Sequence, residues 1–291
     1  MTHRTRAGIV LFVLAQGFAG CGGSDSRSTA SAPSPVPQPA PQPTPPLTSG
    51  VKGQVVDTAD RPISGALVEV VGGPQAGMSV TSGVEGEFYF AGSFDDTTVF
   101  RATKEGHIPA TQSWRRVSGQ PWLLFYLEVL AAPVSLAGEY SLTFTADSAC
   151  ATTLPPELRT RTYAGTIIAA THPIYPANTR FTITASGAEF EAPFNWFSVG
   201  VAGDYLAFWL ADERLIEELD GDTYLELIGS AVAVTTSGAP TISASFDGSF
   251  NYCEKKSATD PFHGCTYSSA AIVTIKASCA SRNHQLVLTR R

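Results

Sequence analysis

Residues 241–252 read TISASFDGSFNY, and this stretch decides the fold that the sequence predicts. Its side chains alternate with a period of two, so that one set lies on one face of an extended strand and the other set on the opposite face. The opposite face carries only serine, threonine, aspartate and asparagine. The stretch therefore predicts a long antiparallel strand with one dry and one wet face. The dry face consists of Ile242, Ala244, Phe246, Gly248, Phe250 and Tyr252.

The same alternation recurs throughout residues 135–291. Tyr140, Leu142 and Phe144 share one face, and Phe181 shares a face with Ile183. About eight antiparallel strands suit an up-and-down β-barrel, because closure removes exposed sheet edges; an open β-sandwich is the alternative. Further strands are predicted at 162–170, 189–201, 205–210, 224–236, 270–277 and 284–289.

The first strand of this domain opens with Gly138-Glu139-Tyr140. These residues weakly resemble the Gly-x-Trp opening of lipocalin-like and avidin-like barrels, with tyrosine in place of tryptophan. The resemblance implies a shared architecture and nothing about ligands.

One segment of the domain has the pattern of a helix. Asp212 can cap its N-terminus, Leu215, Ile216 and Leu219 form one apolar face, and Gly221 can end it. Residues 212–219 are therefore predicted to be helical.

Four of the five cysteines lie in this same domain. In an oxidising compartment an even number of cysteines indicates disulfides, and four cysteines allow three pairings. We favour Cys253–Cys265, which would close a hairpin loop, and Cys150–Cys279, which would join the segment after the first strand to the last hairpin. Zinc bound by these thiols with His263 and His284 is the alternative, but no Cys-x-x-Cys spacing supports it, and we predict no metal site.

A second module occupies residues 50–131, where short alternating segments are separated by turn residues. The pattern resembles the carboxypeptidase regulatory-like domain, although Gly83 and His107 depart from it. The resemblance implies a transthyretin-like β-sandwich of about seven strands that is not catalytic, and peptidase activity is not implied. The residues that carry it are Gly53, Val55, Asp57, Pro62, Ile63, Gly65, Ala66, Val68, Gly86, Phe88, Phe90 and 101–107.

The end of this module, residues 122–130, is apolar on both faces. Such a run is typical of a strand that is covered on two sides. Trp114, Trp122 and Tyr126 are therefore expected to pack in the core. The alternative is that they form an aromatic platform for a sugar.

Residues 1–20 have the organisation of a signal peptide, with basic His3, Arg4 and Arg6 before an apolar run of about twelve residues. Phe18-Ala19-Gly20-Cys21 resembles the lipobox of bacterial lipoproteins, with phenylalanine where leucine is usual. The resemblance implies cleavage before Cys21 and attachment of several acyl chains to that residue, which would anchor the protein stably to a membrane. By the same resemblance, Gly22 favours an outer-membrane lipoprotein of the bacterial cell envelope. An ordinary secretory signal with an incidental cysteine is the alternative.

Residues 21–49 follow as the lipidated terminus and a linker. Alternating prolines between Pro35 and Pro43 favour an extended polyproline II spacer. This segment is therefore interpreted as a stalk.

The net charge of −7 argues against a nucleic-acid partner, which would need a basic surface. No G-x-S-x-G, H-E-x-x-H or Walker sequence occurs, and the five histidines are scattered. We therefore predict no catalytic residues and no cofactor.

These patterns predict a non-catalytic, lipid-anchored cell-envelope protein that presents β modules for surface binding, adhesion or scaffolding. Its partners would be the membrane, through the N-terminal lipid, and an envelope protein or glycan. The alternative is a small-molecule or carbohydrate receptor in which Phe194, Trp196, Phe208 and Trp209 line the barrel. A hydrolase with an unrecognised site is the third hypothesis.

Overall fold

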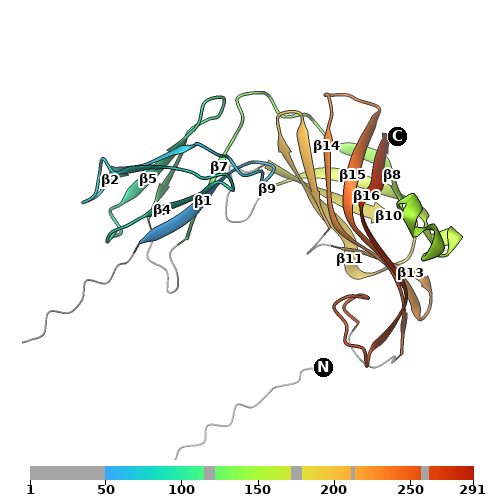
Figure 1. Ribbon diagram of the computed structural model, residues 1–291. Helices are drawn as coiled ribbons and strands as arrows, with labels where there is room; N and C mark the ends of the chain where they lie inside the picture. Colours follow the sequence, from blue (N-terminus) through green and yellow to red (C-terminus); the bar gives the residue numbers. More distant parts are fainter. Residues whose placement is uncertain (1–49, 115–121, 172–178, 211–213, 257–261) are drawn as a thin grey trace, which may run out of the picture. The chain divides into compact units, whose positions relative to one another are not determined.

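The structure is a computed structural model that describes residues 50–114, 122–171, 179–210, 214–256 and 262–291. The chain divides into units 1–46 and 47–291, and all described residues belong to the second unit. These residues form an all-β structure that consists of a two-sheet sandwich and a closed barrel (Figure 1). In this part of the chain no helix is both long and apolar enough to cross a membrane.

The N-terminal module contains the seven predicted strands, arranged in two sheets. The order of the first sheet is β4-β1-β7, with β1 and β7 parallel, and the order of the second is β3-β2-β5-β6. The core contains Phe88, Phe90, Phe100 and Phe125, which come from both sheets. The strands are β1 (Val51–Asp57), β2 (Leu67–Gly72), β3 (Ser79–Thr81), β4 (Glu87–Phe90), β5 (Val99–Thr103), β6 (Ala110–Ser113) and β7 (Trp122–Leu127).

The C-terminal module is a closed antiparallel barrel of eight strands, as predicted, and not an open sandwich. Its strands follow the order β10-β9-β8-β16-β15-β14-β12-β11, and pairing of β10 with β11 closes the barrel. Figure 1 shows β8 beside β16, so the first and last strands of the barrel are neighbours. The strands are β8 (Gly138–Thr145), β9 (Thr160–Thr171), β10 (Thr179–Ser186), β11 (Phe190–Ala202), β12 (Tyr205–Trp209), β13 (Leu215–Asp220), β14 (Thr223–Val234), β15 (Thr241–Lys255) and β16 (Val273–Arg290).

Strands β12 and β13 together make one interrupted strand of the barrel, because both pair with β11 and with β14. Trp209 at the end of β12 lies opposite Ser230 of β14, and Leu215 at the start of β13 lies opposite Leu227. Between these two pairings the chain covers six residues from Trp209 to Leu215, whereas β14 covers only three from Ser230 to Leu227. The offset between these two pairings is an irregularity in the barrel wall, a feature that is often found beside functional sites.

The helix predicted at 212–219 is wrong, because Leu215–Asp220 is strand β13. Leu215, Ile216 and Glu217 are all buried, so consecutive residues are covered on both faces of this strand. A short strand that is buried on both faces can carry apolar residues at positions i, i+1 and i+4, as Leu215, Ile216 and Leu219 do here. The same spacing occurs on one face of a helix, so the sequence pattern does not distinguish the two. Asp212 lies outside the described residues.

The strands predicted at 270–277 and 284–289 belong to a single strand, β16. Its partner β15 is almost as long and pairs with it from Thr241 opposite Thr289 to Lys255 opposite Val273, with two register shifts. Because the partner continues, β16 continues through the residues between the two predicted strands.

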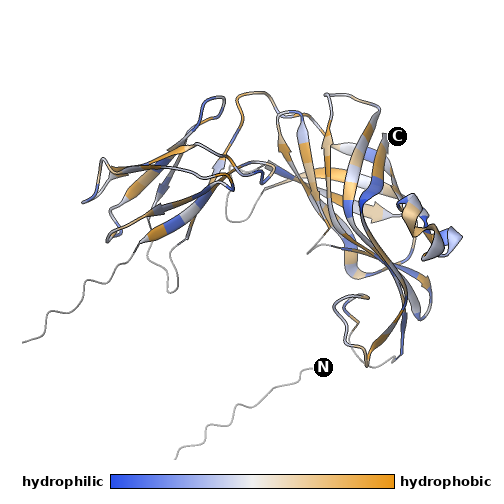
Figure 2. Cartoon of the chain, in the orientation of Figure 1, coloured by the Kyte–Doolittle hydropathy of each residue, from blue (hydrophilic) through white to orange (hydrophobic). Residues whose placement is uncertain are grey.

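The interior of the barrel is filled by side chains. Phe144, Phe197, Phe208, Phe246 and Phe250 are fully buried in one cluster. Figure 2 shows the apolar and polar residues alternating along the barrel strands that supply this cluster.

Both favoured disulfides are present. Cys150, in the 3-10 helix Ser148–Thr152 that follows β8, is bonded to Cys279 of β16. Cys253 of β15 is bonded to Cys265 in the loop that leads to β16.

Candidate functional site

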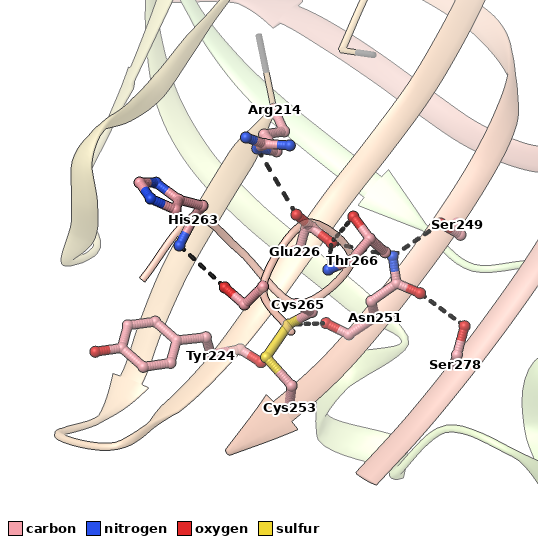
Figure 3. Close-up of a disulfide and its surroundings, with 11 residues drawn as sticks. Arg214, Tyr224, Glu226, Ser249, Asn251, Cys253, His263, Cys265, Thr266 and Ser278 are labelled. Atoms are coloured by element: carbon pink, nitrogen blue, oxygen red, sulfur yellow. Dashed lines mark hydrogen bonds and ion pairs between the residues drawn. A yellow bond between two sulfur atoms is a disulfide. The ribbon is translucent and has the colours of Figure 1, made fainter. Parts of the chain in front are cut away.

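A buried polar cluster lies on the outer wall of the barrel, beside the Cys253–Cys265 disulfide (Figure 3). Glu226 of β14 lies opposite Asn251 of β15, and both face away from the interior, because their neighbours Leu225, Leu227 and Phe250 face into it. Both polar side chains are nevertheless at most 2% exposed. The loop held by the disulfide covers this part of the wet face.

Glu226 is the centre of this cluster. Its Oε2 accepts hydrogen bonds from the Thr266 backbone N–H (3.1 Å) and the Thr266 hydroxyl (2.8 Å). Asn251 Nδ2 donates to the same oxygen at 3.4 Å, and Asn251 Oδ1 accepts from Ser278 at 2.7 Å. The carboxylate therefore joins the covering loop to β15, and Asn251 continues the link to β16.

Arg214 lies at the irregularity between β12 and β13. Its Nε is 3.8 Å from Glu226 Oε1, and its guanidinium lies 4.8 Å from the Phe194 ring centre and 3.9 Å from that of Tyr267. Neither Nε nor Oε1 has a hydrogen-bond partner among the residues that the structure describes. The pair is thus charge-compensated but incompletely hydrogen-bonded.

Burial raises the pKa of Glu226, although the Thr266 hydroxyl and the charge of Arg214 act in the opposite direction. A carboxyl group with such a pKa can serve as a general acid or base only if a reacting group lies within reach. Its contacts among the described residues are an amide, a threonine, an arginine and loop backbone. The arrangement is that of a structural polar cluster.

A cavity of about 550 Å³ adjoins this cluster between the loop and β16. Asn251, Thr266 and Ser278 give it hydrogen-bonding groups, and Lys256, whose Nζ donates to the Ala270 carbonyl at 2.7 Å, gives it a positive charge. These groups can bind a small polar molecule without reacting with it. The remaining lining residues are Cys265, Ser268, Ala270, Val273, Thr274 and Ile275.

A second buried charged group lies at Glu217 of β13. Arg161 of β9 makes two hydrogen bonds to its carboxylate, one of them from Nε at 2.8 Å, and the Tyr163 hydroxyl donates to it at 2.9 Å. Burial and the charge of Glu217 raise the pKa of Tyr163. Arg161 and Tyr163 both belong to β9, so this group stabilises the barrel by linking β13 to β9.

The four residues predicted to line a receptor do not form one site. Phe208 is fully buried in the barrel core, whereas Phe194 stacks on Arg214 at the polar cluster. Trp209 lies on the outer wall above Gly200, with the Arg180 guanidinium 4.5 Å from its ring centre. Trp196 is partly buried on β11, opposite Thr184. Alternation along β11 and β12 puts these aromatics on different faces, so they cannot share a ligand inside the barrel.

The described residues contain no group of three or more His, Cys, Asp or Glu side chains that could hold a metal ion. His284 is fully buried against Phe246 and Phe250, and all four thiols of the domain are in disulfides. The zinc alternative therefore has no support in this part of the chain. Cys21 lies outside the described residues.

Sequence reasoning does not identify Glu226, Arg214 or Asn251 as site residues. By its alternation Asn251 belongs to the wet face of its strand, where polar residues normally meet solvent. The signal that could have found it is Cys253, two residues further along the chain, because a disulfide loop that starts beside the wet face can fold back over it.

The N-terminal module has a length and sheet arrangement that can be compared with known domains. Residues 50–122 match the family model of the carboxypeptidase regulatory-like domain. This match confirms the resemblance seen in the sequence, and the carboxypeptidase regulatory-like domain is a non-catalytic fold.

A search among curated proteins found no match to the chain. One solved structure, of a Bacteroides fragilis protein described as membrane-associated and of unknown function, shares 9% identity with the chain. The alignment covers 83% of this chain and 97% of that chain, with a TM-score of 0.22. A similarity this low supports no argument about fold or function.

Proposed function

We propose that this chain is a lipid-anchored protein of the bacterial cell envelope, without catalytic activity, whose two β modules bind or scaffold other envelope components. The observation that carries the proposal is Phe18-Ala19-Gly20-Cys21, followed by a proline-rich segment that can act as a stalk. The packed barrel interior supports the second half of the proposal, because it leaves the outer surfaces for binding.

Metabolic labelling with a radioactive fatty acid tests the anchor. The wild-type protein should be labelled, and the Cys21→Ala variant should not. Ser24→Ala, three residues further on, is the matched control and should keep the label. Label retained by Cys21→Ala would contradict the proposal.

Membrane fractionation tests the proposed location. The wild-type protein should be found with the outer membrane, and Gly22→Asp should shift it to the inner membrane by the sorting rule that lipoproteins follow. A soluble periplasmic protein in both cases would contradict outer-membrane anchoring.

A small-molecule receptor is the second candidate, and the cavity of about 550 Å³ beside the disulfide loop is the observation that favours it. The test is a screen of small polar compounds against the full chain, measured by thermal shift. Ala270→Trp, which fills the cavity, should abolish the response. Ala280→Trp, an exposed position of β16 outside the lining, should preserve it.

A further inference from the structure

The outward face of the sheet β4-β1-β7 carries a row of three side chains. Lys52 of β1 lies directly opposite Tyr89 of β4 on one side and Trp122 of β7 on the other. All three are exposed, while their neighbours along the strands, such as Phe88 and Leu123, are buried. The strand alternation therefore puts the row on the face that points away from the sandwich core.

The exposure of the two aromatic side chains in this row is high for large apolar residues. Trp122 is 55% and Tyr89 is 47% exposed. Leaving large aromatic side chains in water forgoes burial energy, and neighbouring exposed aromatics on one face are typical of a binding surface. The expectation that Trp122 packs in the core is therefore wrong, whereas Trp114 does pack there.

The Tyr89 ring is held down on the sheet. A Cβ atom added to Gly50 would lie 2.2 Å from the Tyr89 hydroxyl oxygen and 2.2 Å from a ring carbon. The ring thus occupies the space that the missing side chain of Gly50 leaves beside β1. Two strand spacings separate Tyr89 from Trp122, which gives about 9.6 Å between their backbones.

The polar groups of the face are few and nearly balanced in charge. Lys52 lies between the aromatics, and the next row contains Glu87 and Gln54, whose side chain donates to the Glu85 carbonyl at 2.8 Å. One cation and one carboxylate give no field that would attract a polyanion, and the whole chain is acidic. Aromatic faces with interspersed hydrogen-bonding groups suit an uncharged ligand that has both C–H faces and hydroxyls, which is the chemistry of a pyranose.

We propose that this face binds a neutral polysaccharide chain. One sugar ring stacks on Trp122, another on Tyr89, and Lys52 donates hydrogen bonds to hydroxyls of the sugar between them. The proposal specifies the surface-binding part of the proposed function, and it does not depend on the lipid anchor.

Isothermal titration calorimetry of the full chain carrying Cys21→Ala tests this inference. The probes are four neutral hexasaccharides: cellohexaose, xylohexaose, mannohexaose and maltohexaose. At least one should bind the unlipidated protein. Trp122→Ala and Tyr89→Ala should each weaken that binding about tenfold, and Trp122→Phe should retain most of it.

Val84→Ala, at an exposed position of the same module away from the row, is the control and should bind like the parent. Absence of binding to all four probes, or binding that is unchanged in both alanine variants, would overturn the proposal. A parent protein that sediments as a dimer and becomes monomeric with Trp122→Ala, without sugar binding, would identify the face as a self-association surface and would also overturn it. Because the fatty-acid labelling is a separate measurement, failure of the anchor and failure of this site are distinguishable.

Discussion

At the scale of single residues, the barrel wall depends on a close approach between Gly229 of β14 and Gly248 of β15, which lie opposite each other. A Cβ atom on Gly248 would lie 2.3 Å from the Ile228 carbonyl oxygen and 2.7 Å from the Phe246 ring. Phe246 is therefore able to lie against the backbone of both strands because neither glycine carries a side chain.

Gly248→Ala is expected to destabilise the protein by about 2 kcal/mol or more, because the added methyl group meets backbone that cannot move without breaking the ladder. Urea unfolding followed by circular dichroism measures the change. Ser243→Ala, at an exposed position of the same strand, should stay within about 0.5 kcal/mol of wild type. Equal stabilities for the two variants would contradict the close approach.

His284 is a fully buried base in the same wall. Its Nδ1 accepts a hydrogen bond from the Asp147 backbone N–H at 2.9 Å, so this nitrogen is unprotonated. Burial lowers the pKa of His284, against the influence of the Gly248 backbone and of the charges on Asp147 and Asp247. Folding thus favours the neutral imidazole.

Because the folded-state pKa is below the unfolded one, the unfolded chain takes up this proton first as the pH falls. Stability should therefore decrease below about pH 6.5, by at most about 1.4 kcal/mol per pH unit from this group. His284→Gln should flatten the dependence between pH 6.5 and 5, measured by urea unfolding at a series of pH values.

The exposed His263→Gln is the matched control and should retain the loss of stability attributed to His284. Asp147 affects the stability over a different and lower pH range. Hydrogen bonds from Ser281 and the Ala149 backbone lower its pKa to about 2, so its contribution is lost only as the pH falls below about 4. An unchanged slope in His284→Gln above pH 5 would contradict the role given to His284.

At the scale of elements, charged side chains connect β13, the second half of the interrupted strand, to β9. Glu217 of β13 is 3% exposed, and its carboxylate receives both hydrogen bonds from Arg161 of β9. Removing one member of such a pair leaves an uncompensated buried charge, whereas removing both does not.

Arg161→Met is therefore expected to cost about 3 kcal/mol of unfolding free energy. Arg161→Met combined with Glu217→Leu should recover much of that loss. Urea unfolding of the two single variants and the double variant measures the coupling. A double variant that is as unstable as the sum of the singles would show that the pair is not coupled.

Elements with a clear period could be predicted, and elements defined by their neighbours could not. The alternation of residues 241–252 predicted β15, because one face of that strand is dry and one is wet along this stretch. The sequence of β13 has no such contrast, because Glu217 is buried by its pairing with Arg161, a residue far away in the chain. The polar cluster at Glu226 was missed for the same reason, since a distant loop covers it.

At the scale of the whole molecule, the two disulfides close loops of very different size. Cys150 and Cys279 are 129 residues apart, and Cys253 and Cys265 are 12 apart. The cysteine count predicted both disulfides. The interruption between β12 and β13, in contrast, had no signal in the sequence. The seven-stranded sandwich and the closed barrel were both predicted, because strand period and turn spacing persist over each module.

Loop-closure entropy predicts that removing Cys150–Cys279 by alanine substitution of both residues costs about 5 kcal/mol, and that removing Cys253–Cys265 costs about 3 kcal/mol. Urea unfolding under non-reducing conditions measures both. A larger loss for the shorter loop would contradict the entropic explanation. Tryptic mapping without reductant should recover the two linked peptide pairs from the wild-type protein.

The adjacency of β8 and β16 determines how the barrel would respond to mechanical load. Gly138 begins β8 and Arg290 ends β16 at the same end of this pair, so a pull on the chain ahead of β8 opens their hydrogen bonds one after another, as in a zipper. The opening would run to Thr145, the last residue of β8 in the pairing, and would then reach Cys150, which is covalently bonded to Cys279. The long disulfide is thus placed where it arrests such peeling after a single strand.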